Sequence, residues 1–338
     1  MNSASAMHEL RCSQPGEVPA GLLTADEPCV VRGLLAHWPL VQAAHQGAAA
    51  AAAVLRSHWR DATVGVFEMA ADTGGRITYN AEFSGFNFER RLMPFGAVLD
   101  QLLALQQAPA PSFLYMGSTS VDSCLPGFSS SHPLQLETLE PPLASLWLGN
   151  QITVPAHQDW PSNLACCVSG RRRFTVFPPD AVGDLYIGPL DLTPAGQPVS
   201  LVDPLAPDWQ QHFPRYARAL ERAQVVELAP GDALYLPSLW WHRVEALEPF
   251  SGLINYWWRK SPEWSDSPNT ALWLALATVR DLPPAERAAW RALFDHYVFD
   301  ADAHTAAHIP EAARGLLAPF TEAGMRRMRA WLLKKLNR

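Results

Sequence analysis

The spacing of hydrophobic and polar positions changes along the chain and predicts different elements in successive parts. Between residues 43 and 107 it predicts helices at 43–59 and 94–107, with strands at 64–69 and 76–80 between them. Between residues 113 and 258, short β-branched or alternating runs recur between Gly, Pro and Ser residues, which is typical of strands. These strands are predicted at 113–118, 144–148, 152–157, 164–168, 173–177, 225–228, 233–236, 243–246 and 252–258.

Beyond residue 268 no strand pattern remains, and apolar residues recur at helical spacing at 272–279, 290–297 and 325–336. The pattern therefore predicts three regions: a loosely held N-terminal arm (1–27), a β-rich region (28–268) and a C-terminal helical region (269–338). Strands at such regular intervals indicate a barrel or a sandwich, here with a helical insertion at 204–224.

Composition agrees with a β-rich globular protein and limits the classes of partner. Hydrophobic residues make up 48% of the chain, charged residues only 17%, and the 13 Trp and 30 Pro indicate irregular, aromatic-rich segments between short elements. The net charge of −7 argues against a protein held on nucleic acid by its overall field. The sequence shows no basic-then-apolar leader and no long apolar run, so we expect a soluble, cytoplasmic protein. The five Cys lack metal-type spacing and are expected to be free thiols.

The candidate for chemistry is the pair His157 and Asp159, the only His-x-Asp in the sequence. Side chains two apart on a strand point to the same face, so the pair can bind one metal ion from one side. By itself the pair is a weak signal, because a sequence with 11 His and 33 acidic residues contains such a pair by chance about as often as not. We expect the third ligand to be His242, in the second run of strands. Two His and one carboxylate form the facial triad that suits non-haem Fe(II) and leaves three positions open.

The alternative for each histidine is structural. His157 would then cap the end of a strand, and His242 would satisfy a buried polar contact beside Trp241.

Three motifs in order along the chain resemble the cupin-like JmjC family of Fe(II)/2-oxoglutarate oxygenases: HQDWPSN…GRRRFTVFPP, PGDALYLPSLWWHRVE and LINYWW. Within that family the motifs are most similar to those of the asparaginyl hydroxylases that inhibit hypoxia-inducible factor. The resemblance extends from about residue 28 to residue 258. It implies a mainly β fold, a double-stranded β-helix of the cupin or jelly-roll type. It also implies flanking N-terminal α/β elements, a helical C-terminal region, and Fe(II) and 2-oxoglutarate as cofactors.

The resemblance implies hydroxylation of a protein or peptide side chain, with release of succinate and CO2. Because members of the family also accept RNA bases and small molecules, the substrate stays open. The apolar stripe of the last predicted helix is compatible with the dimerising helices of similar enzymes, which implies a homodimer. Two other classes remain open: a cupin-fold metalloenzyme independent of 2-oxoglutarate, and a non-catalytic metal-binding module.

The resemblance also places four residues beside the co-substrate. Arg172 takes the position of a family lysine that binds the distal carboxylate of 2-oxoglutarate, and Tyr115 matches a tyrosine that donates to the same carboxylate. Asn163 and Asn255 match two amides near the metal. Val154 stands where the family has a threonine, so one hydroxyl for the co-substrate is missing, which leaves the pose and identity of the 2-oxo acid open.

The residues themselves allow other readings. Arg172 also fits a solvated turn with its two arginine neighbours, and Tyr115 fits a core position. Six tryptophans near the motifs suit a peptide-binding cage or simple packing. Because neighbours on a strand alternate faces, we expect only about half of them to face the pocket; they are Trp147, Trp160, Trp240, Trp241, Trp257 and Trp258.

Overall fold

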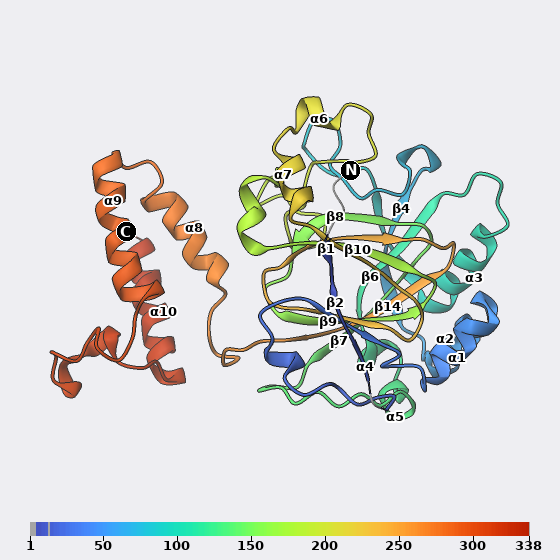
Figure 1. Ribbon diagram of the computed structural model, residues 1–338, viewed down its shortest axis with the longest axis horizontal. Coiled ribbons are helices and arrows are strands. Elements are labelled where there is room, and N and C mark those ends of the chain that lie inside the picture. Colours follow the sequence, from blue (N-terminus) through green and yellow to red (C-terminus); the bar gives the residue numbers. More distant parts are fainter. Residues whose placement is uncertain (1–4, 13, 338) are drawn as a thin grey trace. The chain divides into compact units, whose positions relative to one another are not determined.

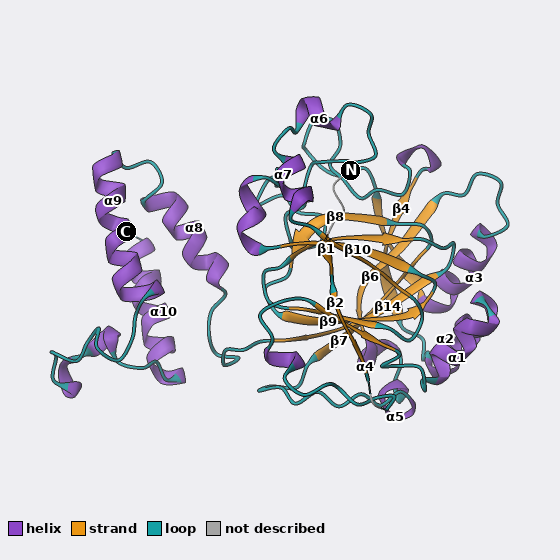
Figure 2. Cartoon of the chain, viewed as in Figure 1, coloured by secondary structure: helices purple, strands orange, loops and turns teal. Residues whose placement is uncertain are grey.

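The computed structural model describes residues 5–12 and 14–337, which divide into two compact units between Lys260 and Ser261. The first unit holds two β-sheets that face each other, with helices on the outside (Figures 1 and 2). The second unit is helical and is described by itself. Residues 1–4 and 13 of the predicted arm, and residue 338, lie outside the described residues.

The larger sheet has nine strands and the smaller has five. In order across the larger sheet, the strands are β2 (His8–Arg11), β3 (Cys29–Arg32), β12 (Ala233–Leu236), β9 (Ser162–Ser169), β14 (Ser251–Trp258), β7 (Leu143–Gly149), β6 (Phe113–Ser120), β4 (Thr63–Met69) and β5 (Glu89–Pro94). The smaller sheet runs β1 (Ser5–Ala6), β11 (Gln224–Leu228), β10 (Arg172–Phe177), β13 (Trp241–Ala246) and β8 (Thr153–Gln158). Every pair is antiparallel except β1 with β11 and β2 with β3.

The helices of this unit lie between strands along the chain. They are α1 (Pro39–Gln46), α2 (Ala48–His58), α3 (Phe95–Leu105), α4 (Val121–Cys124), α5 (Phe128–Ser131), α6 (Trp209–His212) and α7 (Tyr216–Glu221), with short 3-10 turns η1 (Leu22–Thr24), η2 (Ala71–Thr73) and η3 (Pro179–Gly183). The predicted fold class, two mainly antiparallel sheets with flanking helices, is confirmed.

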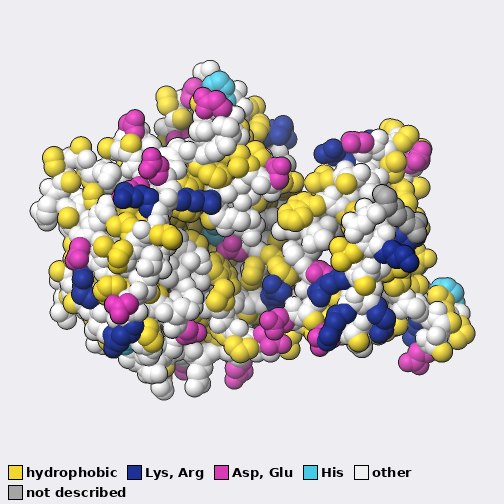
Figure 3. Space-filling view, turned by 180° about the vertical axis from the view of Figure 1, so that it is seen from behind, with side chains coloured by type: hydrophobic (Ala, Val, Ile, Leu, Met, Phe, Trp, Pro, Cys, Tyr) yellow, Lys and Arg dark blue, Asp and Glu magenta, His cyan; other side chains and the backbone are white. Residues whose placement is uncertain are grey.

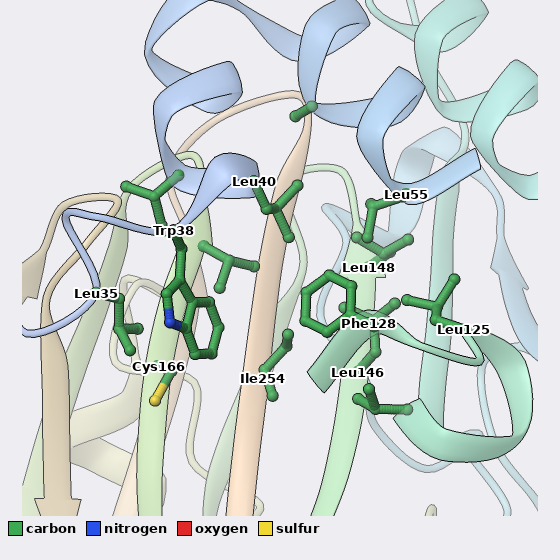
Figure 4. Close-up of a cluster of buried hydrophobic side chains, with 14 of the residues drawn as sticks. Leu35, Trp38, Leu40, Leu55, Leu125, Phe128, Leu146, Leu148, Cys166 and Ile254 are labelled. Carbon is green, nitrogen blue, oxygen red and sulfur yellow. The ribbon is translucent and has the colours of Figure 1, made fainter. Parts of the chain in front are cut away.

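The two largest clusters of buried hydrophobic residues hold these layers together. One lies between the larger sheet and helices α1 to α3, where fully buried Trp38, Leu55 and Phe128 pack against Leu146 and Ile254 of the sheet (Figure 4). The other lies between the two sheets, and it is built from alternate residues of β9, β12 and β14 on one side and β10, β11 and β13 on the other. This alternation is the period-2 pattern of the sequence, and burying it fixes the register of the strands.

Several elements differ from the predictions for physical reasons. The single helix predicted at 43–59 is two helices, because Gly47 has φ 126° and ends α1 before α2 begins. The strand predicted at 76–80 is wrong: this segment makes only isolated bridges, Arg76 with Thr153 and Tyr79 with Phe86. Strand β5 was not predicted, because an edge strand with exposed residues has no apolar alternation to reveal it.

The N-terminal segment is paired where the sequence predicts a loosely held arm. Ser5 and Ala6 pair with Gln224 and Val225 in the smaller sheet. Residues His8–Arg11 pair with Cys29–Arg32 in the larger sheet, and Met7 between the two strands is 6% exposed and packs between the sheets. Consecutive residues therefore tie both sheets together.

The second unit consists of α8 (Pro268–Thr278), α9 (Pro284–Phe294) followed by a π-helical turn at Asp295–Phe299, the 3-10 turns Glu311–Ala313 and Gly315–Leu317, and α10 (Glu322–Leu336). None of the three α-helices has a buried residue, and Trp273, Trp290 and Trp331 are each about half exposed. Hydrophobic side chains lie among Lys and Arg on its outside (Figure 3).

The cysteines and the lengths of the helices can be compared with the predictions over all the described residues. All five cysteines are free thiols, and four of them are buried, as predicted. No helix in the described ranges is both long and apolar enough to cross a membrane.

Candidate metal centre

Strand pairing brings the two predicted histidine ligands together. In the pair β8–β13, His157 and His242 lie directly opposite each other, and their ring centroids are 4.3 Å apart. Asp159 follows β8 by one residue, where its carbonyl accepts a hydrogen bond from the Leu239 N–H at 2.9 Å. One ligand atom from each of the three side chains lies within 4.8 Å of the others. This is close enough for one ion to contact all three.

Both imidazoles are oriented by their own strand. The Nδ1–H of His157 donates to the carbonyl of Pro155 at 2.9 Å, and that of His242 donates to the carbonyl of Trp240 at 3.0 Å. Since a carbonyl only accepts, each Nδ1 carries a proton, and Nε2 is the ring nitrogen that remains to bind a metal. Hydrogen bonding of one ring nitrogen is how proteins fix the other as a metal ligand. A purely structural role for the two histidines would not explain why both Nε2 atoms are left available for a metal.

The environment keeps His242 neutral. Burial, together with the neighbouring His157, lowers the pKa of His242 to about 4, although Asp159 acts in the opposite direction. Its Nε2 lies 3.7 Å from Oδ2 of Asp159, too far for a hydrogen bond. Neutral imidazole is the form that binds a metal, so the site is prepared for one.

The carboxylate of Asp159 is held by two side chains of the larger sheet. Nε1 of Trp257 donates to Oδ2 of Asp159 at 3.2 Å, and Nδ2 of Asn163 approaches the same oxygen at 3.4 Å. Asn255 in turn donates to Oδ1 of Asn163 at 2.6 Å. Both predicted asparagines therefore lie beside the triad and are hydrogen-bonded to each other, as buried amides require.

A cavity of about 320 Å³ opens beside the triad between the two sheets. Its lining is mostly apolar and includes the three candidate ligands together with the four residues predicted for the co-substrate. The other lining residues are Phe67, Ile77, Ser118, Trp147, Val154, Pro161, Phe174, Pro194, Ala195, Gln197, Val199, Val244, Leu253 and Trp257. Its size and apolar walls are typical of a small-molecule site.

Arg172 is buried, which excludes the solvated-turn reading. It is 3% exposed, whereas the side chains of its neighbours Arg171 and Arg173 are 53% and 40% exposed and pair with surface glutamates. Within the described residues its Nε has no partner, and one Nη atom makes only a long contact of 3.4 Å with the Ser251 carbonyl. Burial lowers the pKa of Arg172, but arginine stays charged in proteins. A buried guanidinium that no carboxylate of the described residues pairs with is suited to an incoming carboxylate.

Tyr115 lies beside Arg172 and also lines the cavity. Burial raises the pKa of Tyr115 to about 12, with Arg172 acting in the opposite direction, so the phenol is protonated at neutral pH and can donate. Val154 lines the same cavity and Thr153 does not, so no hydroxyl is present at that point of the wall. Val154 faces the cavity and Thr153 does not because neighbouring residues on a strand point to opposite faces.

Two of the six tryptophans near the motifs, Trp147 and Trp257, line the cavity. Trp241 and Trp258 are buried in packing clusters, Trp240 donates to the carbonyl of Asp26, and Trp160 packs under Arg259. The sequence did not predict the hydrogen bond from Trp257 to Asp159. The position of Trp257 could have indicated it, because Trp257 lies two residues after Asn255 on β14 and therefore points to the same inner face.

Comparisons with known proteins agree with this geometry. A family model described as "Cupin-like domain" matches residues 15–264. The human protein named bifunctional peptidase and (3S)-lysyl hydroxylase JMJD7 is 28% identical over 271 residues, which are 69% of this chain and 77% of the relative.

Two further relatives are covered less completely. Lysine-specific demethylase 8 of Xenopus tropicalis is 25% identical over 265 residues, which are 76% of this chain and 54% of the relative. HSPB1-associated protein 1 homolog of Danio rerio is 38% identical over 116 residues, which are 34% of this chain and 25% of the relative. This chain therefore spans about half of one relative's length and a quarter of the other's.

Proposed function

Because the chain belongs to the cupin-like domain family, we propose that it is an Fe(II)- and 2-oxoglutarate-dependent oxygenase. We propose that it hydroxylates a protein or peptide side chain and that succinate and CO2 are released. The observation that carries this proposal is the convergence of His157, Asp159 and His242 within 4.8 Å at one end of a mostly apolar cavity. Relatives named as a lysyl hydroxylase and a lysine-specific demethylase support the reaction class.

The residues present fit the proposed metal. Two imidazoles and one carboxylate form the donor set that non-haem Fe(II) uses when open positions must remain. Zinc favours a closed tetrahedral set or a catalytic set with a single open position. Bound there with 2-oxoglutarate and oxygen, iron would supply the oxidising chemistry that side chains lack.

Each surrounding residue then has a defined task. His157 and His242 present Nε2 because their Nδ1–H groups are occupied, and Trp257 with Asn163 holds the Asp159 carboxylate in place. Arg172 supplies the charge that binds the distal carboxylate of the co-substrate. The apolar lining, with Val154 and Leu253 among it, excludes water from the reacting groups.

The substrate class, the localisation and the oligomeric state remain to be tested. We propose a protein or peptide substrate, with the small-molecule and RNA alternatives left to experiment. The narrower resemblance to asparaginyl hydroxylases stays a prediction. Cytoplasmic localisation and the domain limits at residues 27 and 268 also stay predictions. Homodimerisation through the C-terminal helices is supported by the absence of buried residues in α8, α9 and α10, and light scattering of the full chain tests it.

Anaerobic addition of Fe(II) and then 2-oxoglutarate tests the function directly. We expect a metal-to-ligand charge-transfer absorption band that needs both components, and succinate release once oxygen and a candidate peptide are added. Oxygen uptake that does not depend on 2-oxoglutarate would indicate another cupin-fold metalloenzyme. Failure to bind Fe(II) or Mn(II) in a calorimeter would indicate a non-catalytic module.

A further inference from the structure

The indole N–H of Trp147 is a buried donor without a partner. Trp147 lies on β7 and its ring lines the cavity, but its Nε1 has no hydrogen-bond partner among the described residues. Among the described residues, the indole N–H groups of five other tryptophans do donate hydrogen bonds, namely those of Trp38, Trp59, Trp240, Trp241 and Trp257. Because a buried N–H is rarely left unpaired, a donor of this kind in a cavity wall indicates a ligand acceptor.

Trp147 stands next to two other donors. Its ring stacks on Tyr115 with centroids 5.8 Å apart and an interplanar angle of 24°. Tyr115 in turn interacts electrostatically with Arg172, whose Nε is also unpaired. Indole and guanidinium groups can only donate, and a protonated phenol donates readily. Together these donors suit an anion with two acceptor oxygens.

Positions along strand β14 show where Arg172 lies relative to the three candidate metal ligands. Ser251, at the start of β14, pairs with Gly149, and its carbonyl is contacted by Arg172. Trp257, near the other end of the strand, is bonded to Asp159. With about 3.3 Å per residue, these two positions are roughly 20 Å apart along the strand.

Trp147 pairs with Leu253, two residues from Ser251. Its ring also meets Trp257 edge-on at 5.8 Å, so it forms the wall between the two ends. Arg172 therefore lies toward the end of the cavity away from Asp159, and Trp147 lies at a strand position between Arg172 and Trp257. Val154, in the same cavity, offers no donor.

We propose that Trp147 is a specificity-determining residue whose Nε1–H donates to the distal carboxylate of the 2-oxo acid co-substrate, together with Arg172 and Tyr115. This inference rests on the proposed function. It implies that the site discriminates a dicarboxylic 2-oxo acid such as 2-oxoglutarate from pyruvate, which lacks the distal carboxylate, partly through this one N–H.

The test is an anaerobic titration of the Fe(II)-loaded full chain, read from the charge-transfer band. Trp147→Phe keeps an aromatic ring and removes the donor, and we expect the Kd for 2-oxoglutarate to rise roughly 10-fold. The Kd for pyruvate and the affinity for Fe(II) should not change. Trp59→Phe is the matched control, because the Trp59 N–H donates to the Ala62 carbonyl away from the cavity. A second variant, Trp147→Leu, should lose the same selectivity, and circular dichroism checks that both variants fold.

The outcomes separate this inference from the function on which it rests. A wild-type protein that binds Fe(II) but no 2-oxo acid would overturn both. Normal 2-oxoglutarate binding by Trp147→Phe would overturn only the role of Trp147. Equal weakening of 2-oxoglutarate and pyruvate would also overturn that role, because the effect would then not depend on the distal carboxylate.

Discussion

The indole Nε1 of Trp257, on the nine-stranded sheet, donates to Oδ2 of Asp159, which follows a strand of the five-stranded sheet, at 3.2 Å. The candidate metal centre therefore spans both sheets: two imidazoles and the carboxylate come from one sheet, and the group that orients the carboxylate comes from the other. Any change in the spacing between the sheets would alter the position of this carboxylate. Each of the following predictions tests one part of this arrangement.

Trp257→Phe should weaken metal binding while leaving the three candidate ligands in place. Removing a hydrogen bond to a ligating carboxylate costs about 10-fold in metal affinity. Isothermal titration with Mn(II) in the absence of oxygen measures the change. An affinity equal to that of the wild type would show that the contact with Asp159 does not orient a ligand.

Asp159→Ala should abolish both tight Fe(II) binding and 2-oxoglutarate turnover, because it removes the only carboxylate of the donor set. Asp72→Ala, a change at an exposed position in η2, is the control and should retain both activities. Succinate formation is the measurement. Turnover that survives Asp159→Ala would mean that the triad is wrongly assigned.

Arg172→Ala should raise the Kd for 2-oxoglutarate by roughly 10- to 100-fold, the usual range for losing a hydrogen bond to a charged group. The affinity for Fe(II) should be unchanged, since Arg172 does not belong to the triad. Arg173→Ala is a matched control, because Arg173 is the next residue on the same strand but faces solvent and pairs with Glu227. If both variants bound 2-oxoglutarate like the wild type, the co-substrate carboxylate would have to be bound elsewhere.

Part of the fold and of the candidate metal centre could be predicted from the sequence. Alternation of apolar residues predicted most strands, and the spacing of His157 and Asp159 predicted a shared face. Neither could show that His242 lies opposite His157, because register depends on the packing of both sheets. Three consecutive arginines look alike in sequence, and only the pleat of β10 decides that Arg172 points inward. The sequence could not show that the Trp147 N–H is unpaired, because this depends on whether the neighbouring strands place a hydrogen-bond acceptor beside it.

Gly75→Ala should destabilise the fold much more than Gly74→Ala. Both glycines have positive φ, but a Cβ at Gly75 would lie 2.5 Å from the Gln151 carbonyl oxygen and 2.6 Å from the Phe113 ring, whereas a Cβ at Gly74 would meet nothing within 4 Å. We expect a loss of about 1 kcal/mol for Gly74→Ala from backbone strain alone. For Gly75→Ala we expect a loss of more than about 2 kcal/mol.

Urea denaturation measures both losses. The Gly75 carbonyl accepts the Thr153 N–H at the start of β8, so Gly75→Ala should also weaken metal binding at His157. Equal losses for the two variants would contradict the predicted clash.

The stability of the protein should fall in mild acid because of His132. This side chain is 1% exposed, its Nδ1–H donates to the Phe128 carbonyl, and its Nε2 accepts the Leu40 N–H at the start of α1. Burial is the main cause that lowers the pKa of His132 from 6.5 to about 4. Between these two values the unfolded chain binds a proton that the folded chain does not. The free energy of unfolding should therefore decrease as pH falls from about 6.5 to about 4, by up to about 3 kcal/mol, and level off below.

His132→Gln keeps an acceptor for the Leu40 N–H and removes the titrating group. Its free energy of unfolding should vary less with pH than that of the wild type over this window, as measured by urea denaturation at a series of pH values. A difference between the two proteins that does not change with pH would show that His132 does not titrate differently in the folded and unfolded states.

The pairing of residues 5–11 with both sheets has a consequence for biosynthesis. Strand β1 leaves the ribosome long before its partner β11, which emerges only after most of the two sheets has been made, since Ser5 pairs with Gln224. Contacts between such distant segments form late and slowly. Until then the edges of β3 and β11 that the segment covers remain open to other chains. A bulky fusion placed next to this segment should therefore lower the yield of monodisperse protein during expression, even if the protein that does fold binds metal normally.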